Sequence, residues 1–343
     1  MRILTLLSIS AILFSACKKN SSTAKSVVSK DAFTETTTAS DQYMFLTEQS
    51  QNRYGFVNVT QNVWWWTWKA GINNNIPASA VSWFDGPNDI KPIFSQSHVI
   101  LCGQGGGVAI VRISDKTAVF YAHYSGNIHS VEILPDGNLV AASVGPANDG
   151  STDSLVVFSV GASNFPNNVY RKAIPFPGVH NCVWDRTRNC LWAAGTTVLR
   201  KINYNFNCTA PVLNAVDSVF LPVQPGNVHE LFPVYGKDSL HLSTGGKVWY
   251  VDVKNVILHL PKDSMFRYIK DLAGIKSISS GPSGYKTVVQ KCLNDSMWWN
   301  DEIDDITNLT PVYQESGTKI YKGRWKVNNS FSYPDGQAYT VCH

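Results

Sequence analysis

Beyond residue 40, the chain alternates short apolar runs with tight polar turns. Three runs, "LVAAS", "LWAAG" and "LHLST", each follow a turn of the type "PDGN", "DRTRN" or "YGKDS". Another run comes after each of them, at 154–160, 197–204 and 247–253. Short apolar runs that are bounded by Gly, Pro, Asn and Asp are typical of β-strands. The pattern therefore predicts an all-β protein built of short strands.

Each set of strands begins with the same motif, in which a turn residue and a β-branched residue precede a basic one. The motif reads "GNIHS", "PGVHN", "GNVHE" and "AGIKS", and its basic residues are His129, His180, His229 and Lys276. Their spacings are 51, 49 and 47 residues. A repeat of about 50 residues with strand-like content predicts the blades of a β-propeller. A less regular copy at 89–113 places Lys91 in the basic position.

These copies account for five first strands, and the two ends of the chain are expected to supply a sixth blade. Residues 43–68 contain three strand-like runs without a first strand, and the tail at 329–343 is the candidate for the missing one. Pairing of a C-terminal strand with the N-terminal ones closes the ring and removes exposed sheet edges. We therefore predict six blades, and a seventh stays open if 300–327 contains another.

The first 40 residues predict export and a membrane anchor. Residues 1–16 combine a positive start with a short apolar run, as in a signal peptide, and Cys17 follows two small residues, as in a bacterial lipobox. Residues 17–40 are polar and rich in Ser and Thr, which favours a tether. We expect a lipid on Cys17, a propeller domain at 41–343 and an outer-membrane location, with the periplasmic and surface faces both open. An ordinary signal peptide is the alternative.

Charge and cysteine content narrow the classes of partner. The net charge is only +4, and no run of Lys or Arg follows the tether, which argues against nucleic acid as a partner. No Cys-x-x-Cys occurs, so a zinc ribbon is not expected. Disulfide pairing stays open among the cysteines of the propeller domain, which are Cys102, Cys182, Cys190, Cys208, Cys292 and Cys342.

Equivalent positions of successive blades face one another around the channel of a propeller. Lys91, His129, His180, His229 and Lys276 are therefore expected at one mouth of the channel. Three interpretations stay open for them. They tie blades together by hydrogen bonds, they bind the carboxylate or sulfate of an anionic ligand, or the three histidines hold a divalent transition metal such as Mn or Zn. The acidic stretch "NDEIDD" at 300–305 is a candidate for Ca through oxygen ligands, and a solvated turn is its favoured interpretation. No cofactor is certain.

Two groups of aromatic residues are further candidates. Trp83 and Phe84 lie in a loop-like stretch before a blade, where binding residues concentrate, so we expect them to contact a ligand. In the run at 62–68, alternation places Trp64, Trp66 and Trp68 on one face of a strand. Packing between blades is the favoured interpretation of this run, and stacking on a sugar is the alternative.

Three segments make the chain resemble β-propeller lipoproteins of the Bacteroidota whose activity is not established. They are 48–71, which includes "EQSQNRYGFVNV" and "WWWTWKAG", the histidine-containing blade starts, and "IYKGRW" at 320–325. The blade-start histidines are also similar to those of oligogalacturonate lyases, which implies metal-dependent cleavage of polyuronate. Asp-Ser pairs such as Asp153-Ser154 resemble the O-glycosylation sequon of that phylum, and turn chemistry explains them equally well.

These observations favour an envelope lipoprotein whose propeller mouth binds a glycan, with an anionic glycan as the preferred ligand. A metal-assisted polyuronate lyase or hydrolase with His129, His180 and His229 as ligands is the first alternative. A scaffold without catalysis is the second. Whether the protein is an enzyme is left open by the sequence.

Overall fold

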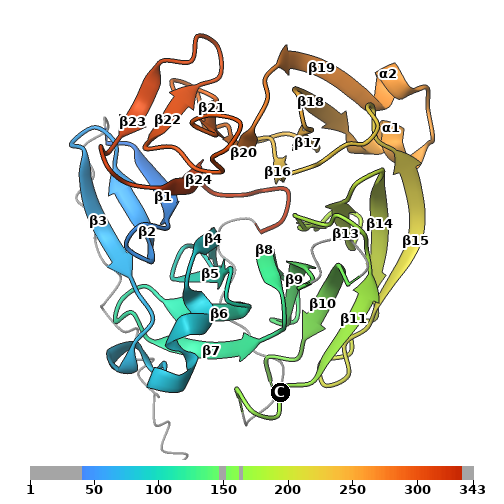
Figure 1. Ribbon diagram of the computed structural model, residues 1–343. Helices are drawn as coiled ribbons and strands as arrows, with labels where there is room; N and C mark the ends of the chain where they lie inside the picture. The colour runs from blue at the N-terminus through green and yellow to red at the C-terminus, as the bar shows by residue number, and fades with distance from the viewer. Residues whose placement is uncertain (1–40, 147–151, 162–164, 334–343) are drawn as a thin grey trace, which may run out of the picture. The chain divides into compact units, whose positions relative to one another are not determined.

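The computed structural model describes residues 41–146, 152–161 and 165–333, all within a compact unit that spans 35–343. The predicted signal peptide, Cys17, the predicted tether and residues 334–343 lie outside the described residues. Six four-stranded antiparallel sheets form the blades of a six-bladed β-propeller (Figure 1). The predicted fold class is confirmed, and 300–327 contains no seventh blade.

The blades are numbered here from the N-terminus, each with its innermost strand first. Blade 1 contains β24 (Ile320–Trp325), β1 (Tyr43–Glu48), β2 (Arg53–Asn58) and β3 (Val63–Trp68). Blade 2 contains β4 (Pro87–Ile93), β5 (His98–Gly103), β6 (Gly107–Arg112) and β7 (Ala118–His123). Blade 3 contains β8 (Asn127–Ile133), β9 (Leu139–Val144), β10 (Ser154–Phe158) and β11 (Arg171–Pro175).

The second half of the chain forms the other three blades in the same way. Blade 4 contains β12 (Val183–Asp185), β13 (Cys190–Ala194), β14 (Val198–Tyr204) and β15 (Leu213–Phe220). Blade 5 contains β16 (Glu230–Pro233), β17 (Ser239–Ser243), β18 (Lys247–Asp252) and β19 (Phe266–Asp271). Blade 6 contains β20 (Ile275–Ser279), β21 (Val288–Lys291), β22 (Glu302–Asp305) and β23 (Pro311–Gln314).

Short helices occur in two connections between the strands. They are η1 (Ile72–Asn74) and η2 (Ala78–Phe84) before β4, and α1 (Val253–Ile257) and α2 (Lys262–Met265) before β19. Among the described residues, no helix has the length and apolar character needed to cross a bilayer.

Apolar residues alternate so that neighbouring blades share a buried cluster. The described residues form six such clusters, and each lies between two adjacent blades. Between blades 5 and 6, for example, Val248 of β18 packs with Ile275 of β20 and Val289 of β21. Because every blade buries both faces against its neighbours, hydrophobic burial stabilises the closed ring rather than any single blade.

As expected, a strand from the C-terminal part of the chain pairs with the N-terminal strands and closes the ring. It is not the strand that the sequence predicts. β24, which is the segment "IYKGRW", pairs with β1 and is the innermost strand of blade 1. The expectation that the tail supplies this strand is wrong for its described part. Ser332 Oγ instead donates to the carbonyl of Trp184 at 2.7 Å, and the carbonyl of Phe331 accepts from the N–H of Arg186. Buried Phe331 packs in the cluster between blades 4 and 5, which favours this path.

A β-bulge changes the arrangement of the tryptophan run in β3. The register between β2 and β3 shifts so that Val57 lies opposite Trp64 and Phe56 lies opposite Trp66, which leaves Trp65 as the extra residue. Trp64 therefore packs in the cluster towards blade 6, whereas Trp66 and Trp68 are buried towards blade 2. The expected core packing is confirmed, and the expected common face of the three alternate tryptophans is wrong because the bulge reverses it.

Candidate binding site at the channel mouth

One side chain from each blade lies at the same level near the beginning of the innermost strand. In four blades, a one-residue register shift leaves this residue unpaired as a β-bulge. The bulged residues are Asn88 in β4, His129 in β8, Lys276 in β20 and Tyr321 in β24. His180 and His229 hold the corresponding places just before β12 and β16. Bulges redirect side chains; we call these six residues the mouth ring.

Local sequence explains how the chain reaches this position. Two residues before a mouth-ring residue, the backbone adopts positive φ at Gly86, Gly178, Asn227 and Gly274. At Gly178, φ is +71° and a Cβ would lie 2.0 Å from Thr196 Oγ1, so a side chain has no room. The β-branched residue that follows is buried, as at Val179 and Ile275. The turn and the buried aliphatic together present the next residue to the channel.

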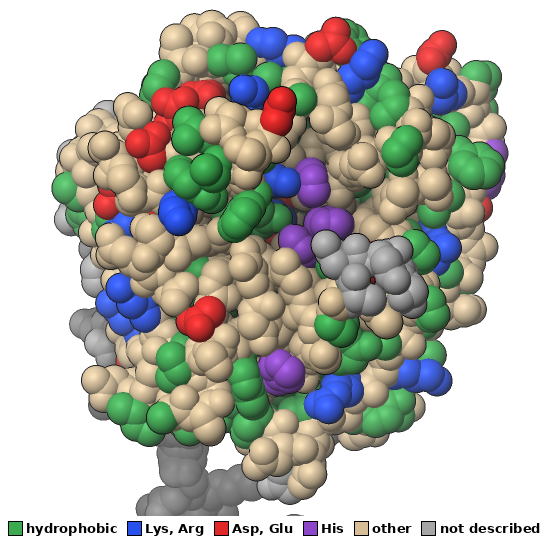
Figure 2. All heavy atoms as spheres, in the orientation of Figure 1, with side chains coloured by type: hydrophobic (Ala, Val, Ile, Leu, Met, Phe, Trp, Pro, Cys, Tyr) green, Lys and Arg blue, Asp and Glu red, His purple; other side chains and the backbone are tan. Residues whose placement is uncertain are grey.

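The three histidines form a continuous group. The ring centroids of His129 and His180 are 4.2 Å apart, and those of His180 and His229 are 5.0 Å apart. Tyr321 extends the group, because its hydroxyl lies 2.9 Å from Nδ1 of His129. Figure 2 shows histidines gathered around the hollow at the centre of the face that it draws, with a basic side chain beside them.

The histidines are neutral at neutral pH. Burial lowers the pKa of His180 to about 4, even though Nδ1 of this residue lies 3.0 Å from the carbonyl of Gly178. Burial also lowers the pKa of His129 and of His229 well below the ordinary value. A carbonyl accepts only, so Nδ1 of His180 carries the proton and its Nε2 offers a lone pair. Nδ1 of His229 is buried and has no hydrogen-bond partner within the described part of the chain.

Lys276 is the cation of the mouth ring, and it has no anionic partner among the described residues. It is buried, and burial lowers the pKa of its ammonium, an effect to which the nearby charge of Lys322 adds. The other buried Lys and Arg side chains of the described chain, Arg53, Lys91, Lys322 and Arg324, all lie within 4 Å of a carboxylate. A buried ammonium without an anion beside it costs free energy, which makes Lys276 a candidate for contact with an external anion.

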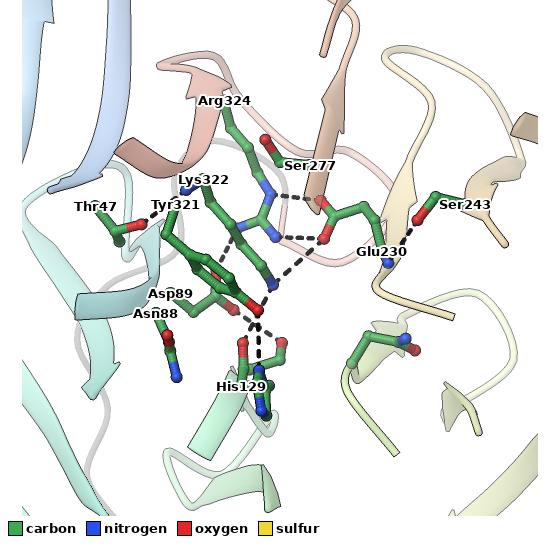
Figure 3. Close-up of polar contacts among 12 residues, drawn as sticks. Thr47, Asn88, Asp89, His129, Glu230, Ser243, Ser277, Tyr321, Lys322 and Arg324 are labelled. Carbon is green, nitrogen blue, oxygen red and sulfur yellow. Dashed lines mark hydrogen bonds and ion pairs between the residues drawn. The ribbon is translucent and has the colours of Figure 1, made fainter. Parts of the chain in front are cut away.

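Beneath the mouth ring lies a second group of charged residues, which we call the channel network: Asp89, Lys91, Glu132, Glu230, Lys322 and Arg324. Arg324 binds Glu230 with two bonds of 2.8 Å and also contacts Asp89 (Figure 3). Lys322 lies 3.4 Å from Glu230, and Lys91 lies 3.2 Å from Glu132. Three cations therefore face three carboxylates, all of them buried.

The pKa values of Arg324 and Asp89 follow this pairing, whereas at Glu132 burial outweighs the nearby ammonium of Lys91 and raises the pKa of the carboxyl. Burial opposes the charge of Arg324, yet Asp89 and Glu230 raise its pKa above the ordinary value. Burial also opposes the charge of Asp89, but Arg324, Lys322 and Lys91 hold its pKa well below the usual range. The network is therefore a set of mutually neutralised ions that joins four of the six innermost strands.

The structure corrects the sequence-based mouth at one position. Lys91 lies three residues beyond Asn88, the true counterpart of His129, and its ammonium contacts Ser130, Glu132 and the carbonyl of Cys182. Lys91 therefore belongs to the channel network. Sequence reasoning missed Asn88 and Tyr321. Each residue has one local signal of the motif. Gly86 supplies the turn before Asn88, and Ile320 supplies the aliphatic residue before Tyr321.

The expected aromatic ligand contacts lie elsewhere. Phe84 is buried, and its ring packs at 5.4 Å from that of Trp68. It is a core residue because η2 turns it inward, so the expectation for Phe84 is wrong. Trp83 is half-buried against His123 and Tyr121 of the outermost strand β7, away from the mouth ring. This placement gives no support to a role of Trp83 at the mouth.

The sequence also raised the questions of a metal site and of disulfide bonds. In the described ranges, no group of three or more His, Cys, Asp or Glu side chains could hold a metal ion, so the proposed histidine site gains no support. Four cysteines, Cys102, Cys182, Cys190 and Cys292, are free and buried. Cys208 is disulfide-bonded. Cys17 and Cys342 lie outside the described residues.

Comparison with family models then places the chain. The model of a family of unknown function, DUF6528, matches residues 1–343. The chain belongs to the DUF6528 family. This membership agrees with a resemblance to propellers without an established activity. Membership of this family does not support an origin in the Bacteroidota, and it does not support a similarity to oligogalacturonate lyases.

Solved structures share the fold at low identity. A protein of unknown function from Bacteroides caccae is 12% identical, has a TM-score of 0.52, and covers 83% of this chain and 99% of its own. A luciferin-regenerating enzyme is 11% identical, has a TM-score of 0.51, and covers 88% and 92%. Such identities show the fold alone. No curated protein sequence matches the chain.

Proposed function

We propose that the DUF6528 propeller is a binding module whose mouth ring engages an acidic glycan. The observation that carries this proposal is Lys276, a buried ammonium without a carboxylate partner among the described residues. A carboxylate or sulfate at this position forms a charge-assisted hydrogen bond and offsets the cost of the buried charge. Beside it, Nε2 of neutral His180 accepts a hydrogen bond from a hydroxyl group.

The proposal is tested by binding measurements on the purified domain. Isothermal titration with digalacturonate, a chondroitin sulfate disaccharide and sialyllactose is expected to give binding to wild type for at least one probe. Lys276→Met is expected to weaken that binding at least tenfold, since a charge-assisted hydrogen bond contributes about 1.5–3 kcal/mol. Lys247→Met is the matched control, because Lys247 is half-exposed and pairs with Asp271. Equal binding by wild type and Lys276→Met would contradict the proposal.

The location of the module is part of the proposal. Lipidation of Cys17 would hold the propeller on the outer membrane through the tether at 17–40, within reach of envelope or environmental glycans. Metabolic labelling with an alkyne fatty acid tests this anchor. Label in wild type and none in Cys17→Ala is the expected result, and an unlabelled wild type would rule out the lipid.

A further inference from the structure

A pocket opens beside the mouth ring and shares Lys276 with it. Its volume is about 380 Å³, and its wall includes Lys276, Lys291, Cys292, Asn294, Met297 and Trp298. The last three belong to the loop between β21 and β22 of blade 6. Ligand pockets in proteins span roughly 300–1,000 Å³, so this one suits a small ligand or a single unit of a larger one.

Trp298 is exposed and yet held in a defined orientation. Half of its surface is accessible, at 50%. Its indole N–H donates to Oε1 of Gln49 at 2.9 Å, and Nε2 of the same Gln49 donates to Oδ1 of Asn88 at 3.1 Å. The indole is therefore tied, through one side chain, to a member of the mouth ring. Fixing an aromatic ring before the ligand arrives reduces the entropy lost on binding.

The lining offers three kinds of contact to an acidic sugar, and it also includes one carboxylate, that of Asp295. Trp298 offers an apolar aromatic face, Lys276 and Lys291 offer ammonium groups, and Asn294 offers an amide. The C–H groups on one face of a pyranose ring pack against an aromatic face, while its hydroxyls bond to amides and its acid group bonds to ammonium. A flat apolar ligand would use only the first of these contacts, and an inorganic anion would use only the ammonium groups.

We propose that this pocket is the subsite that binds one acidic sugar ring of the glycan, stacked on Trp298 with its acid group on Lys276. The assignment rests on the proposed function because Lys276 belongs to both sites. It adds the class of ligand, a saccharide rather than any anion, and the residue that selects it.

The test compares three variants by isothermal titration with the acidic saccharides above. Trp298→Ala is expected to weaken binding about fivefold to tenfold, as expected for the loss of one aromatic contact. Trp298→Phe, which keeps an aromatic face, is expected to recover at least half of the lost binding free energy. Leu293→Ala is the matched control: it lies in the same loop, is 51% exposed and is not part of the pocket wall. It is expected to bind like wild type.

Further probes separate this inference from the proposed function. Adipate, a dicarboxylate without a ring, is expected to bind weakly, to depend on Lys276 and to be insensitive to Trp298→Ala. Saccharide binding that is lost in Lys276→Met but unchanged in Trp298→Ala would overturn the subsite and leave the proposed function standing. Tighter binding of naphthoate than of every saccharide would overturn the sugar assignment. No binding of any acidic probe would overturn both.

Discussion

The mouth ring and the channel network lie one layer apart in the same channel, and they differ in how they hold charge. In the network, Lys91, Lys322 and Arg324 all contact a buried carboxylate. In the mouth ring, Lys276 has no such partner among the described residues, and burial keeps the adjoining histidines neutral. Neutralised ions of this kind hold strands together, whereas an unpaired cation costs folding free energy. This difference favours a structural role for the channel network and supports the binding role that we propose for the mouth ring.

The largest loss of stability is expected from a change in the channel network. Glu230→Gln removes the carboxylate that binds Arg324 and Lys322, so Lys322 loses its ion-pair partner and Arg324 keeps only Asp89. We expect the free energy of unfolding to fall by about 3–5 kcal/mol, measured by urea denaturation. Asp115→Asn, which breaks the exposed pair with Arg112, is the control and is expected to cost less than about 1 kcal/mol. Similar small losses in both variants would remove the distinction.

An intermediate effect is expected from the pH dependence of the mouth ring. The pKa of His180 is lowered from 6.5 to about 4, so the unfolded chain binds a proton there at a pH where the folded ring does not. The free energy of unfolding therefore falls as pH decreases from 7 through 6.5 towards 4. Between pH 7 and pH 5, this residue is expected to contribute a loss of about 1–2 kcal/mol.

His180→Gln isolates this contribution. The pKa values of buried His98 and His241 are also lowered to about 4, but both residues remain in the variant. The slope of unfolding free energy against pH is expected to be shallower in His180→Gln than in wild type. Identical slopes would show that His180 is not neutral in the folded ring.

The smallest expected effect concerns Lys276. Lys276→Met replaces an unpaired buried ammonium by an apolar chain, so the free energy of unfolding is expected to stay within about 1 kcal/mol of wild type or to rise. Lys322→Met, one layer deeper, is expected to cost about 3 kcal/mol because Glu230 loses a cation. Urea denaturation of both variants measures the contrast. A large loss in Lys276→Met would mean that this residue is structural.

The sequence motif locates four of the six mouth-ring residues correctly. His129, His180, His229 and Lys276 follow a turn residue and a buried aliphatic one, and both signals are local. Lys91 has the basic character and the approximate spacing of the motif, but the turn at Gly86 lies two residues before Asn88, so Asn88 and not Lys91 reaches the mouth. A bulge adds a residue to one strand only, and it is specified by pairing with the next strand rather than by the strand's own sequence.

The pocket and the channel network could not be located in this way. Arg324 and Asp89 are 235 residues apart, and Trp298 and Gln49 are 249 residues apart. Nothing in the neighbourhood of Trp298 indicates that its indole is held by the N-terminal blade. Trp298 also lies in an irregular loop of blade 6, which is not part of the repeated motif.

Local chemistry in this chain specifies the strands, the period of about 50 residues and the turn that precedes most mouth-ring residues, because apolar alternation and backbone preferences act over a few residues. Long-range packing specifies the rest. It selects β24 rather than the tail to close the ring, and it places each carboxylate beside a cation of another blade. It also leaves Lys276 without a carboxylate partner among the described residues, because the partners of a buried charge come from strands that meet only when the ring closes.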